Sequence, residues 1–443
     1  MSTLHRRLLI PIAAAGVIGM ALTGCVGDAP ADTGDIDCSQ YTDYGTFEGS
    51  PEVSIYGTIV EVEADALNES WADFEACTGI DIVYQGTQEF EAQVRVLVDG
   101  GTAPDLAIFP QPGLFQSFSD SLVKPSQATL DNISNNWSAD WAGYGQIDGV
   151  QYAAPLMASV KGFVWYSPSF FSDKGYEVPA TIDELMTLTA KIAADGTVPW
   201  CAGFASGEAS GWPGTDWVED FVLRQSGPEV YDQWVSHEIP FNDPRIVEAF
   251  DAVGKILKDP AYVNGGFGDV LSINDTTFND GGLPILDGAC AMHHQATFYS
   301  SFWPEGTTVA PDGDIWAFIL PGVEAGAGAV TGGGEIVAAF SDRPEVQAVQ
   351  TYLSSALWAN NRVSLGGVIS ANKGLDPANA SSELLSSAIT ILQDPTTTFR
   401  FDASDLMPGA VGADSFWKGI VAWIGGQDTQ TTVDNIEASW PAS

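Results

Sequence analysis

Hydrophobic and polar positions alternate with two different periods along the first hundred residues of the folded chain. Strand-like alternation occurs at 52–58 and 80–85, helical spacing occurs at 61–78 and 88–98, and a short apolar run covers 105–109. This β-α-β-α-β order predicts a parallel sheet whose strands are joined by crossover helices.

Several later helices are predicted from their first residues. The stretch Thr181 to Glu184 has the capping-box pattern, in which a threonine and a glutamate bind backbone N–H groups at a helix start. Asp243 followed by Pro244 suits the N-cap and first positions of another helix. A further helix is expected to begin near Pro344 and to reach about Trp358.

The length of the chain predicts two domains. At 443 residues it exceeds what one hydrophobic core usually organises. Hydrophobic residues make up 45%, which favours a packed fold over disorder. We find no repeat of solenoid length and no long linker. We therefore expect the chain to pass between the domains more than once.

Residues 1–24 have the pattern of an export signal. A basic start precedes the apolar run Leu8 to Leu22, which is too short for an ordinary membrane span. The run leads into Leu-Thr-Gly-Cys, which resembles a bacterial lipobox and implies cleavage before Cys25 and a diacylglycerol on its sulfur. A plain secretory signal with an incidental cysteine is the alternative. Residues 25–37 are small and acidic, so we expect a flexible tether.

The charge of the chain restricts its partners. The formal net charge is −42, and without residues 1–24 it becomes about −44, since 14 basic residues then face 58 acidic ones. Nucleic acid and anionic lipid are disfavoured as ligands, because phosphate binding draws on lysine and arginine. The acidic surplus suits a self-repelling surface protein and also disfavours an anionic ligand.

The five cysteines suggest disulfides rather than a metal site. If Cys25 carries lipid, four remain, an even number in an exported chain. Three pairings are possible. We favour Cys38 with Cys77 and Cys201 with Cys290, because each pair then lies in one region of the chain. The spacing C-x-x-C is absent from the sequence, so zinc and thioredoxin chemistry have no support.

Motifs for cofactors or metals are weak. The glycine-rich run 326–335 fits no phosphate-binding pattern and predicts a mobile loop before a strand at 336–340. His293 and His294 are adjacent, so a strand would point them to opposite faces. The stretch 274–282 lacks the EF-hand spacing. We therefore expect no cofactor and no metal.

Tryptophans next to glycine, proline and aspartate favour a carbohydrate site. Trp212, Trp217, Trp316 and Trp417 have such neighbours. An aromatic ring covers the C–H face of a pyranose, while carboxylates and amides bind its hydroxyls. The alternative is that these rings fill small hydrophobic cores beneath loops.

The order of these features resembles the family 1 extracellular solute-binding proteins of carbohydrate ABC importers, the maltose-type group. The likeness runs from about residue 38 to residue 443 and looks like that of the alpha-glucoside-binding subgroup. It rests on segments such as FEACTGIDIVYQG, GGTAPDLAIFPQPG, VWYSPSFF, GWPGTDWVEDFVLR, MHHQATF, GGGEIVAAF and FRFDASDLMPGAVG.

This resemblance implies an α/β fold of the two-lobed, class II periplasmic-binding-protein type, each lobe a mostly parallel sheet flanked by helices and joined to the other by hinge crossings. The implied parts are a lipoprotein signal peptide (1–24), a tether (25–37), a first lobe (38–160 and 326–398) and a second lobe (161–325 and 399–443).

The resemblance also implies a binding site in the cleft between the lobes, with no catalysis and no cofactor. Carried over by position, the candidate ligand-binding residues are Gln111, Ser159, Lys161, Trp212, Asp216, Gln295, Gly334, Glu335, Asp405, Met407 and Trp417. The implied partners are a saccharide and the transmembrane subunits of an ABC permease, with no nucleic acid. We expect a monomer that contacts the outer face of the bacterial cell membrane only through its lipid.

Gln111 has a special place in this prediction. It follows the strand 105–109 within Pro-Gln-Pro-Gly, and ligands of open parallel sheets bind beyond the carboxyl ends of the strands. The prolines at 110 and 112 restrict the backbone on both sides, so the amide would be held before a ligand arrives. A plain strand-to-helix turn is the alternative.

The leading hypothesis is a lipid-anchored receptor for an alpha-glucoside. One alternative is an exported glycoside hydrolase, for which Glu335 is the best single carboxylate. Another is a binding protein for a cationic or compatible solute, which would need an acidic or aromatic cage.

Overall fold

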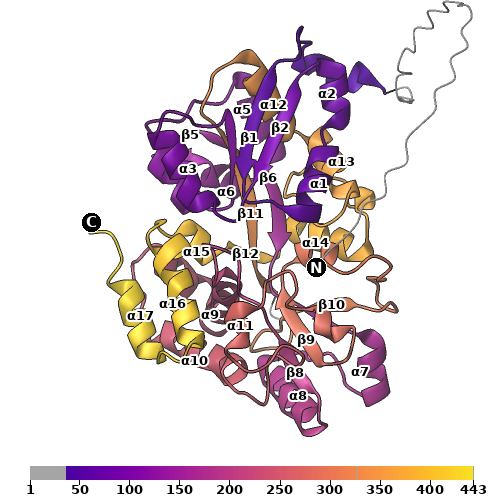
Figure 1. The fold of residues 1–443 in the computed structure, drawn as a ribbon, viewed down its shortest axis with the longest axis vertical. Helices are drawn as coiled ribbons and strands as arrows, with labels where there is room; N and C mark the ends of the chain where they lie inside the picture. Colours follow the sequence, from indigo (N-terminus) through magenta and orange to yellow (C-terminus); the bar gives the residue numbers. More distant parts are fainter. Residues whose placement is uncertain (1–35, 327, 443) are drawn as a thin grey trace, which may run out of the picture. The chain divides into compact units, whose positions relative to one another are not determined.

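Two β-sheets organise the computed structural model, which describes residues 36–326 and 328–442 (Figure 1). The larger sheet has the order β12-β11-β3-β1-β2, with β6 paired to β11. Its strands are β1 (Glu52–Gly57), β2 (Asp81–Gly86), β3 (Leu106–Phe109), β6 (Ala153–Val160), β11 (Ala329–Ala339) and β12 (Thr398–Phe401). The smaller sheet has the order β10-β7-β9-β8. Its strands are β7 (Phe163–Tyr166), β8 (Val198–Cys201), β9 (Cys290–Gln295) and β10 (Trp316–Ile319).

Helices surround each sheet, and each sheet with its helices is called a lobe below (Figure 1). Around the larger sheet, the first lobe has α1 (Glu61–Glu69), α2 (Ala72–Thr78), α3 (Phe90–Asp99), α4 (Pro112–Phe115), α5 (Gln127–Asn136), α6 (Ala139–Tyr144), α12 (Pro344–Leu353), α13 (Ala356–Ser364) and α14 (Glu383–Gln393). Around the smaller sheet, the second lobe has α7 (Pro168–Lys174), α8 (Ile182–Ala194), α9 (Trp212–Val235), α10 (Pro244–Leu257), α11 (Ser272–Asp275), α15 (Ala403–Leu406), α16 (Trp417–Ile424) and α17 (Thr429–Glu437).

The predicted β-α-β-α-β start is confirmed. Strand β1 pairs in parallel with both β2 and β3. The predicted helix 61–78 is two helices, because Trp71 leaves helical geometry (φ −118°, ψ 6°) and the Ser70 hydroxyl donates to Leu67 O at 2.6 Å. Likewise, the helix expected from Pro344 to Trp358 ends at Leu353, and Ser355 caps the next one, α13.

The predicted helix starts at Thr181 and Asp243 are also confirmed. The Thr181 side chain accepts from Glu184 N, and the Glu184 carboxylate accepts from Ala180 N at 2.7 Å. Asp243 accepts from Arg245 N at the start of α10, whose first residue is proline. Both signals depend only on neighbouring residues, which is why the sequence alone reveals them.

The prediction of a mobile loop at 326–335 is wrong for most of that run, because residues 329–339 form the central strand β11. Its glycines let neighbouring backbones approach closely. A Cβ on Gly334 would lie 2.3 Å from Met157 O, and one on Gly332 would lie 2.7 Å from Ser159 O. Glycine in a strand here marks close contact rather than a break in the sheet.

Each sheet contains both parallel and antiparallel strand pairs. Strand β11 is antiparallel to β3 and β6, and β7 is antiparallel to β9 and β10, while β8 and β9 are parallel. In the described part of the chain the lobes are joined at Lys161–Gly162 after β6, between β10 and β11, and after β12. These links place Lys161 and Asp402 side by side.

Both favoured disulfides are present. Cys38 bonds Cys77 with a Cα–Cα distance of 5.3 Å, and Cys201 bonds Cys290 with a Cα–Cα distance of 5.9 Å. The second disulfide joins β8 to β9. Strand β9 also sends its adjacent histidines to opposite sides, as predicted: His293 contacts Cys201 O at 3.0 Å and His294 contacts Asp220 at 2.7 Å.

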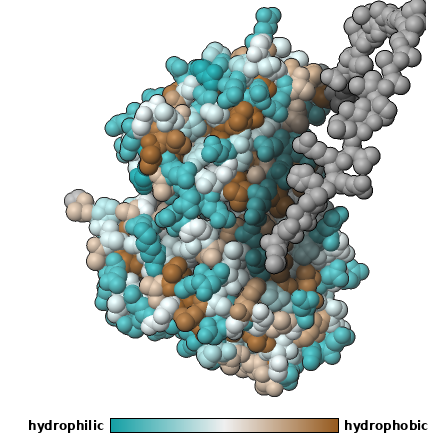
Figure 2. All heavy atoms as spheres, in the orientation of Figure 1, coloured by the Kyte–Doolittle hydropathy of each residue, from teal (hydrophilic) through white to brown (hydrophobic). Residues whose placement is uncertain are grey.

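The hydrophobic residues of the described chain are concentrated inside. On the face drawn in Figure 2, hydrophobic residues lie in small groups between hydrophilic ones. Among the described residues, we find no helix that combines the length and the apolar composition needed to span a bilayer. Cys25, the predicted lipidation site, lies outside the described residues, as do residues 1–24 and most of the predicted tether.

Candidate functional site

A cavity between the two lobes receives most of the predicted binding residues. Its wall comes from the β1–α1 connection, the start of α3, the end of β3, the paired strands β6 and β11, the start of α9, and the segment after β12. The predicted residues that line it are Gln111, Ser159, Lys161, Trp212, Gly334, Glu335, Asp405 and Trp417. These eight come from segments far apart in the sequence, so only the fold brings them together.

Three predicted residues do not line the cavity. Asp216 lies behind its wall and contacts Lys161 Nζ at 2.8 Å. Gln295 is buried at the end of β9, where its Oε1 accepts from Ala296 N at 2.9 Å. Met407 is fully buried in the hydrophobic core of the second lobe. Asp216 therefore acts on the cavity through Lys161, whereas Gln295 and Met407 support the fold around it.

Other lining residues were missed by the sequence reasoning. They include Glu63, Gln88, Glu91, Ser206, Phe278, Phe298, Arg362, Asp402 and Ser404. Glu63 lies on α1 and Arg362 on α13, where nothing in the local sequence separates them from an exposed glutamate or arginine. Asp402 and Ser404 belong to the segment FRFDASDLMPGAVG, which carried part of the resemblance, so that signal was available.

An aromatic surface forms one part of the wall. The Trp212 ring lies 5.2 Å from the ring of Phe278 and 6.0 Å from that of Phe298. Trp212 is the first residue of α9 and Trp417 the first of α16, so these tryptophans begin helices rather than lie in loops. Trp217 points into the hydrophobic core instead. Two of the four singled-out tryptophans thus line the cavity.

Gln111 is held as predicted at the end of β3. It is the N-cap of α4, with φ −109° and ψ 102°, and Pro112 is the first residue of that helix. The residue is 4% exposed. The amide Nε2 donates to Glu91 Oε1 at 2.8 Å, while Oε1 is buried without a hydrogen-bond partner among the described residues.

Lys161 lies over a cluster of buried acids. Its Nζ donates to Asp216 and to Asp402, and it lies 5.6 Å from the centre of the Trp212 ring. Gly333 makes room for this side chain, since a Cβ there would lie 3.2 Å from Lys161 Cε. The lysine thus supplies the positive charge that these carboxylates need when buried.

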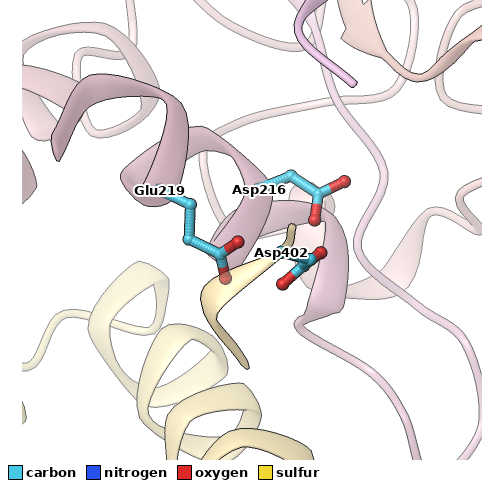
Figure 3. Close-up of side chains that lie close together, drawn as sticks. All are labelled: Asp216, Glu219 and Asp402. Carbon is cyan, nitrogen blue, oxygen red and sulfur yellow. The ribbon is translucent and has the colours of Figure 1, made fainter. Parts of the chain in front are cut away.

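Figure 3 shows the carboxylates of Asp216, Glu219 and Asp402 pointing toward one another. One oxygen from each carboxylate lies within 4.8 Å of one oxygen from each of the others. Although burial opposes it, Lys161 and hydrogen bonds from Glu219 and Ser404 lower the pKa of Asp402. Burial and the nearby Asp402 raise the pKa of Glu219, whose carboxylate accepts hydrogen bonds from Ala403 N at 2.9 Å and Ser404 N at 3.1 Å. Lys161, the Ser404 hydroxyl and two backbone N–H groups already bind these carboxylates, so the cluster fits a structural ion pair better than a metal site.

Three further charged residues, Glu63, Glu335 and Arg362, line the cavity on its first-lobe side. Burial raises the pKa of Glu63 to about 8 and that of Glu335 to about 7, although Arg362 opposes both shifts. Burial also lowers the pKa of Arg362 to about 10. Together the wall offers aromatic faces, hydrogen-bond acceptors and a few donors. That mixture suits a polyhydroxylated ligand of low net charge.

Comparisons with known proteins identify the family of this chain. Residues 61–357 match the family model described as bacterial extracellular solute-binding protein. The chain is 37% identical over 428 residues to the osmoprotective compounds-binding protein GgtB of Synechocystis sp., covering 95% of this chain and 97% of that protein. It is 38% identical over 400 residues to the alpha-glucosides-binding periplasmic protein AglE of Rhizobium meliloti, covering 85% and 84%.

Solved structures share the fold. The solute receptor AcbH superposes with a TM-score of 0.75 at 18% identity, covering 88% of this chain and 98% of that one. Maltose-bound MalE3 of T. maritima superposes with a TM-score of 0.67 at 15% identity, covering 88% and 98%. The predicted two-lobed α/β fold is thereby confirmed. The chain belongs to the bacterial extracellular solute-binding protein family, as an extracytoplasmic solute-binding component of an ABC importer and not an enzyme.

Proposed function

We propose that the protein captures an alpha-glucoside of two or a few sugar rings in the cavity and delivers it to the membrane permease of a sugar importer. The observation that carries this proposal is the composition of the cavity wall. The rings of Trp212, Phe278 and Phe298 line the same cavity as the polar groups of Gln111 and Lys161. A pyranose needs both, because its C–H face packs on aromatic rings while its hydroxyls need donors and acceptors.

The names of similar proteins support a sugar. AglE is named for alpha-glucosides, and the solved structures include RafE with raffinose and MalE3 with maltose. GgtB is named instead for osmoprotective compounds. A second candidate is therefore a compatible solute with a quaternary ammonium group, which would lie among the three aromatic rings in a cavity that Glu63 and Asp405 also line.

Isothermal titration calorimetry on the chain without residues 1–24 separates these candidates. We expect binding of maltose, trehalose, sucrose or maltotriose with a Kd in the micromolar range or below, and no heat with glycine betaine or amino acids. Binding of betaine without any saccharide would favour the second candidate. Binding of neither class would overturn the proposed function.

We also propose that Cys25 carries the lipid that holds the protein on the outer face of the membrane, with the signal peptide and tether divided as predicted at residues 24 and 37. The basis is the Leu-Thr-Gly-Cys pattern after the apolar run. Metabolic labelling with an alkyne fatty acid tests this anchor. Label should enter the wild-type protein and not Cys25→Ser, and equal labelling of both would refute it.

A further inference from the structure

Glu91 and Gln111 form a pair on the cavity wall that the proposed binding role leaves unexplained. Both residues line the cavity, and Gln111 Nε2 donates to Glu91 Oε1 at 2.8 Å. Glu91 lies in the first turn of α3, whereas Gln111 is the N-cap of α4. The contact therefore joins two separate elements at the surface that a ligand would meet.

The chemistry of this pair determines which way the Gln111 amide faces. The NH2 end of the amide faces Glu91, because the glutamate oxygen accepts the hydrogen bond that Gln111 Nε2 donates. The carbonyl Oε1 then points away from the glutamate. This oxygen is buried and has no partner among the described residues.

An unpartnered buried acceptor is unfavourable, by about 1–3 kcal/mol, unless a ligand supplies a donor. The backbone around Gln111 offers little freedom to relieve it, because Pro110 and Pro112 lie on both sides. Trp417 presents the complementary feature, since its indole Nε1 is buried, has no partner among the described residues, and lines the same cavity. Arg362 lines the cavity as well, and its Nε is a second buried donor without a partner among the described residues. The wall thus offers one unused acceptor at Gln111 and unused donors at Trp417 and Arg362.

We propose that Glu91 is a positioning residue. It holds the Gln111 amide so that the carbonyl oxygen accepts from a ligand hydroxyl, and it thereby selects ligands that present an O–H group at this point. This inference rests on the proposed function, in that the ligand is a saccharide. It adds that the site requires a hydroxyl that donates a hydrogen bond, and that Glu91 is the residue responsible for this requirement.

Deoxyfluoro sugars test the inference, because fluorine replaces a hydroxyl in size but cannot donate a hydrogen bond. Calorimetry would compare the best saccharide with its set of monodeoxyfluoro analogues. In the wild type, we expect at least one analogue to bind about tenfold more weakly than the parent sugar, as for the loss of one buried hydrogen bond.

In Glu91→Gln, the new amide can donate to Gln111 Oε1, and the orientation of Gln111 is no longer determined. We expect the parent sugar to lose about tenfold in affinity, and the penalty of that analogue to fall to about twofold or less. Asp99→Asn is the matched control, because it removes the same charge from an exposed position on α3. It should keep both the affinity and the penalty, and both variants should melt like the wild type.

Three results would overturn the role of Glu91. One is a wild type in which no analogue is penalised. Another is a Glu91→Gln variant that binds the parent sugar as the wild type does. A third is a variant that loses affinity equally for the parent and for every analogue, which indicates a general structural role. Absence of any saccharide binding by the wild type is different, since it refutes the proposed function itself and this inference with it.

Discussion

Lys161 connects the ligand cavity with the buried acids beneath it. Its ammonium contacts Asp216 and Asp402, and its side chain is 9% exposed. Two buried carboxylates therefore depend on one cation that also faces the cavity. A buried ion pair gives little net stability as a whole, but loss of one member leaves an uncompensated charge.

We expect Lys161→Met to lower the free energy of unfolding by about 3–5 kcal/mol and to weaken ligand binding. Urea denaturation followed by tryptophan fluorescence measures the first effect. Lys418→Met is the matched control, since Lys418 and Asp414 form an ion pair that is largely exposed. This variant should lose about 1 kcal/mol or less of its free energy of unfolding. Equal losses of unfolding free energy in the two variants would contradict the role of burial.

The buried carboxyl group of Glu335 should make the stability of the fold depend on pH. Burial raises the pKa of Glu335 to about 7 from its ordinary 4.5, so the folded chain binds this proton more tightly than the unfolded chain does. Stability should therefore fall as the pH rises from about 4.5 through 7. Glu63, whose pKa burial raises to about 8, adds to the same trend.

We expect the melting temperature of the wild type to fall between pH 5 and pH 8, and Glu335→Gln to flatten this decline because glutamine cannot ionise. Calorimetric melting curves at several pH values measure it. Glu248→Gln, at an exposed position on α10, should follow the wild-type curve. A Glu335→Gln curve parallel to the wild type would rule out this source of the trend.

Among the elements, the turn between β6 and β7 joins the two lobes through a glycine. Gly162 has φ +74°, and a Cβ there would lie 2.5 Å from Asp220 Oδ2 and 2.9 Å from Arg224 Nη2. Asp220 and Arg224 form a buried ion pair on α9. Both the backbone geometry and the neighbouring helix thus require a residue without a side chain.

We expect Gly162→Ala to lower the free energy of unfolding by more than the about 1–2 kcal/mol of left-handed strain, because the methyl group also displaces the buried ion pair. Gly149→Ala separates the two effects, since Gly149 has φ +73° and nothing within 4 Å of the added Cβ. Urea denaturation compares them. If both variants lose the same free energy of unfolding, the contact between the new methyl group and Asp220 does not destabilise the fold.

At the scale of the whole binding unit, a polar contact joins the lobes beside the cavity. Asn279 Nδ2, from the second lobe, donates to Glu61 Oε2, from the first, at 2.7 Å. Their neighbours Phe278 and Val60 line the cavity. Glu61 has φ +55°, an unusual geometry for a non-glycine residue, at the start of α1. We expect this contact to help hold the lobes together while ligand is bound.

We expect Asn279→Ala to raise the dissociation rate of the ligand about two- to fivefold, as for about 0.5–1 kcal/mol, and to leave the association rate nearly unchanged. Stopped-flow fluorescence measures both rates. Asn242→Ala is the control, because Asn242 makes a similar exposed contact with Asp434 at 2.7 Å but within the second lobe. A dissociation rate equal to that of the wild type would refute the contact's role.

The sequence by itself determined the features that neighbouring residues encode. The alternation of β1, the caps at Thr181 and Asp243, and the bend at Gln111 between two prolines all involve residues only a few positions apart. Such short-range signals survive without a fold, because backbone geometry and local hydrogen bonds produce them. The resemblance of ordered segments added the family.

Only the tertiary structure decided which groups share the cavity. Lys161 and Asp402 are 241 positions apart, and Glu63, Glu335 and Arg362 come from three separate elements. The glycine-rich run became the central strand β11 because Met157 and Ser159 pack against it, a contact that no local pattern encodes. Burial then raised the pKa values of Glu63 and Glu335, because the folded chain excludes water from their carboxyl groups.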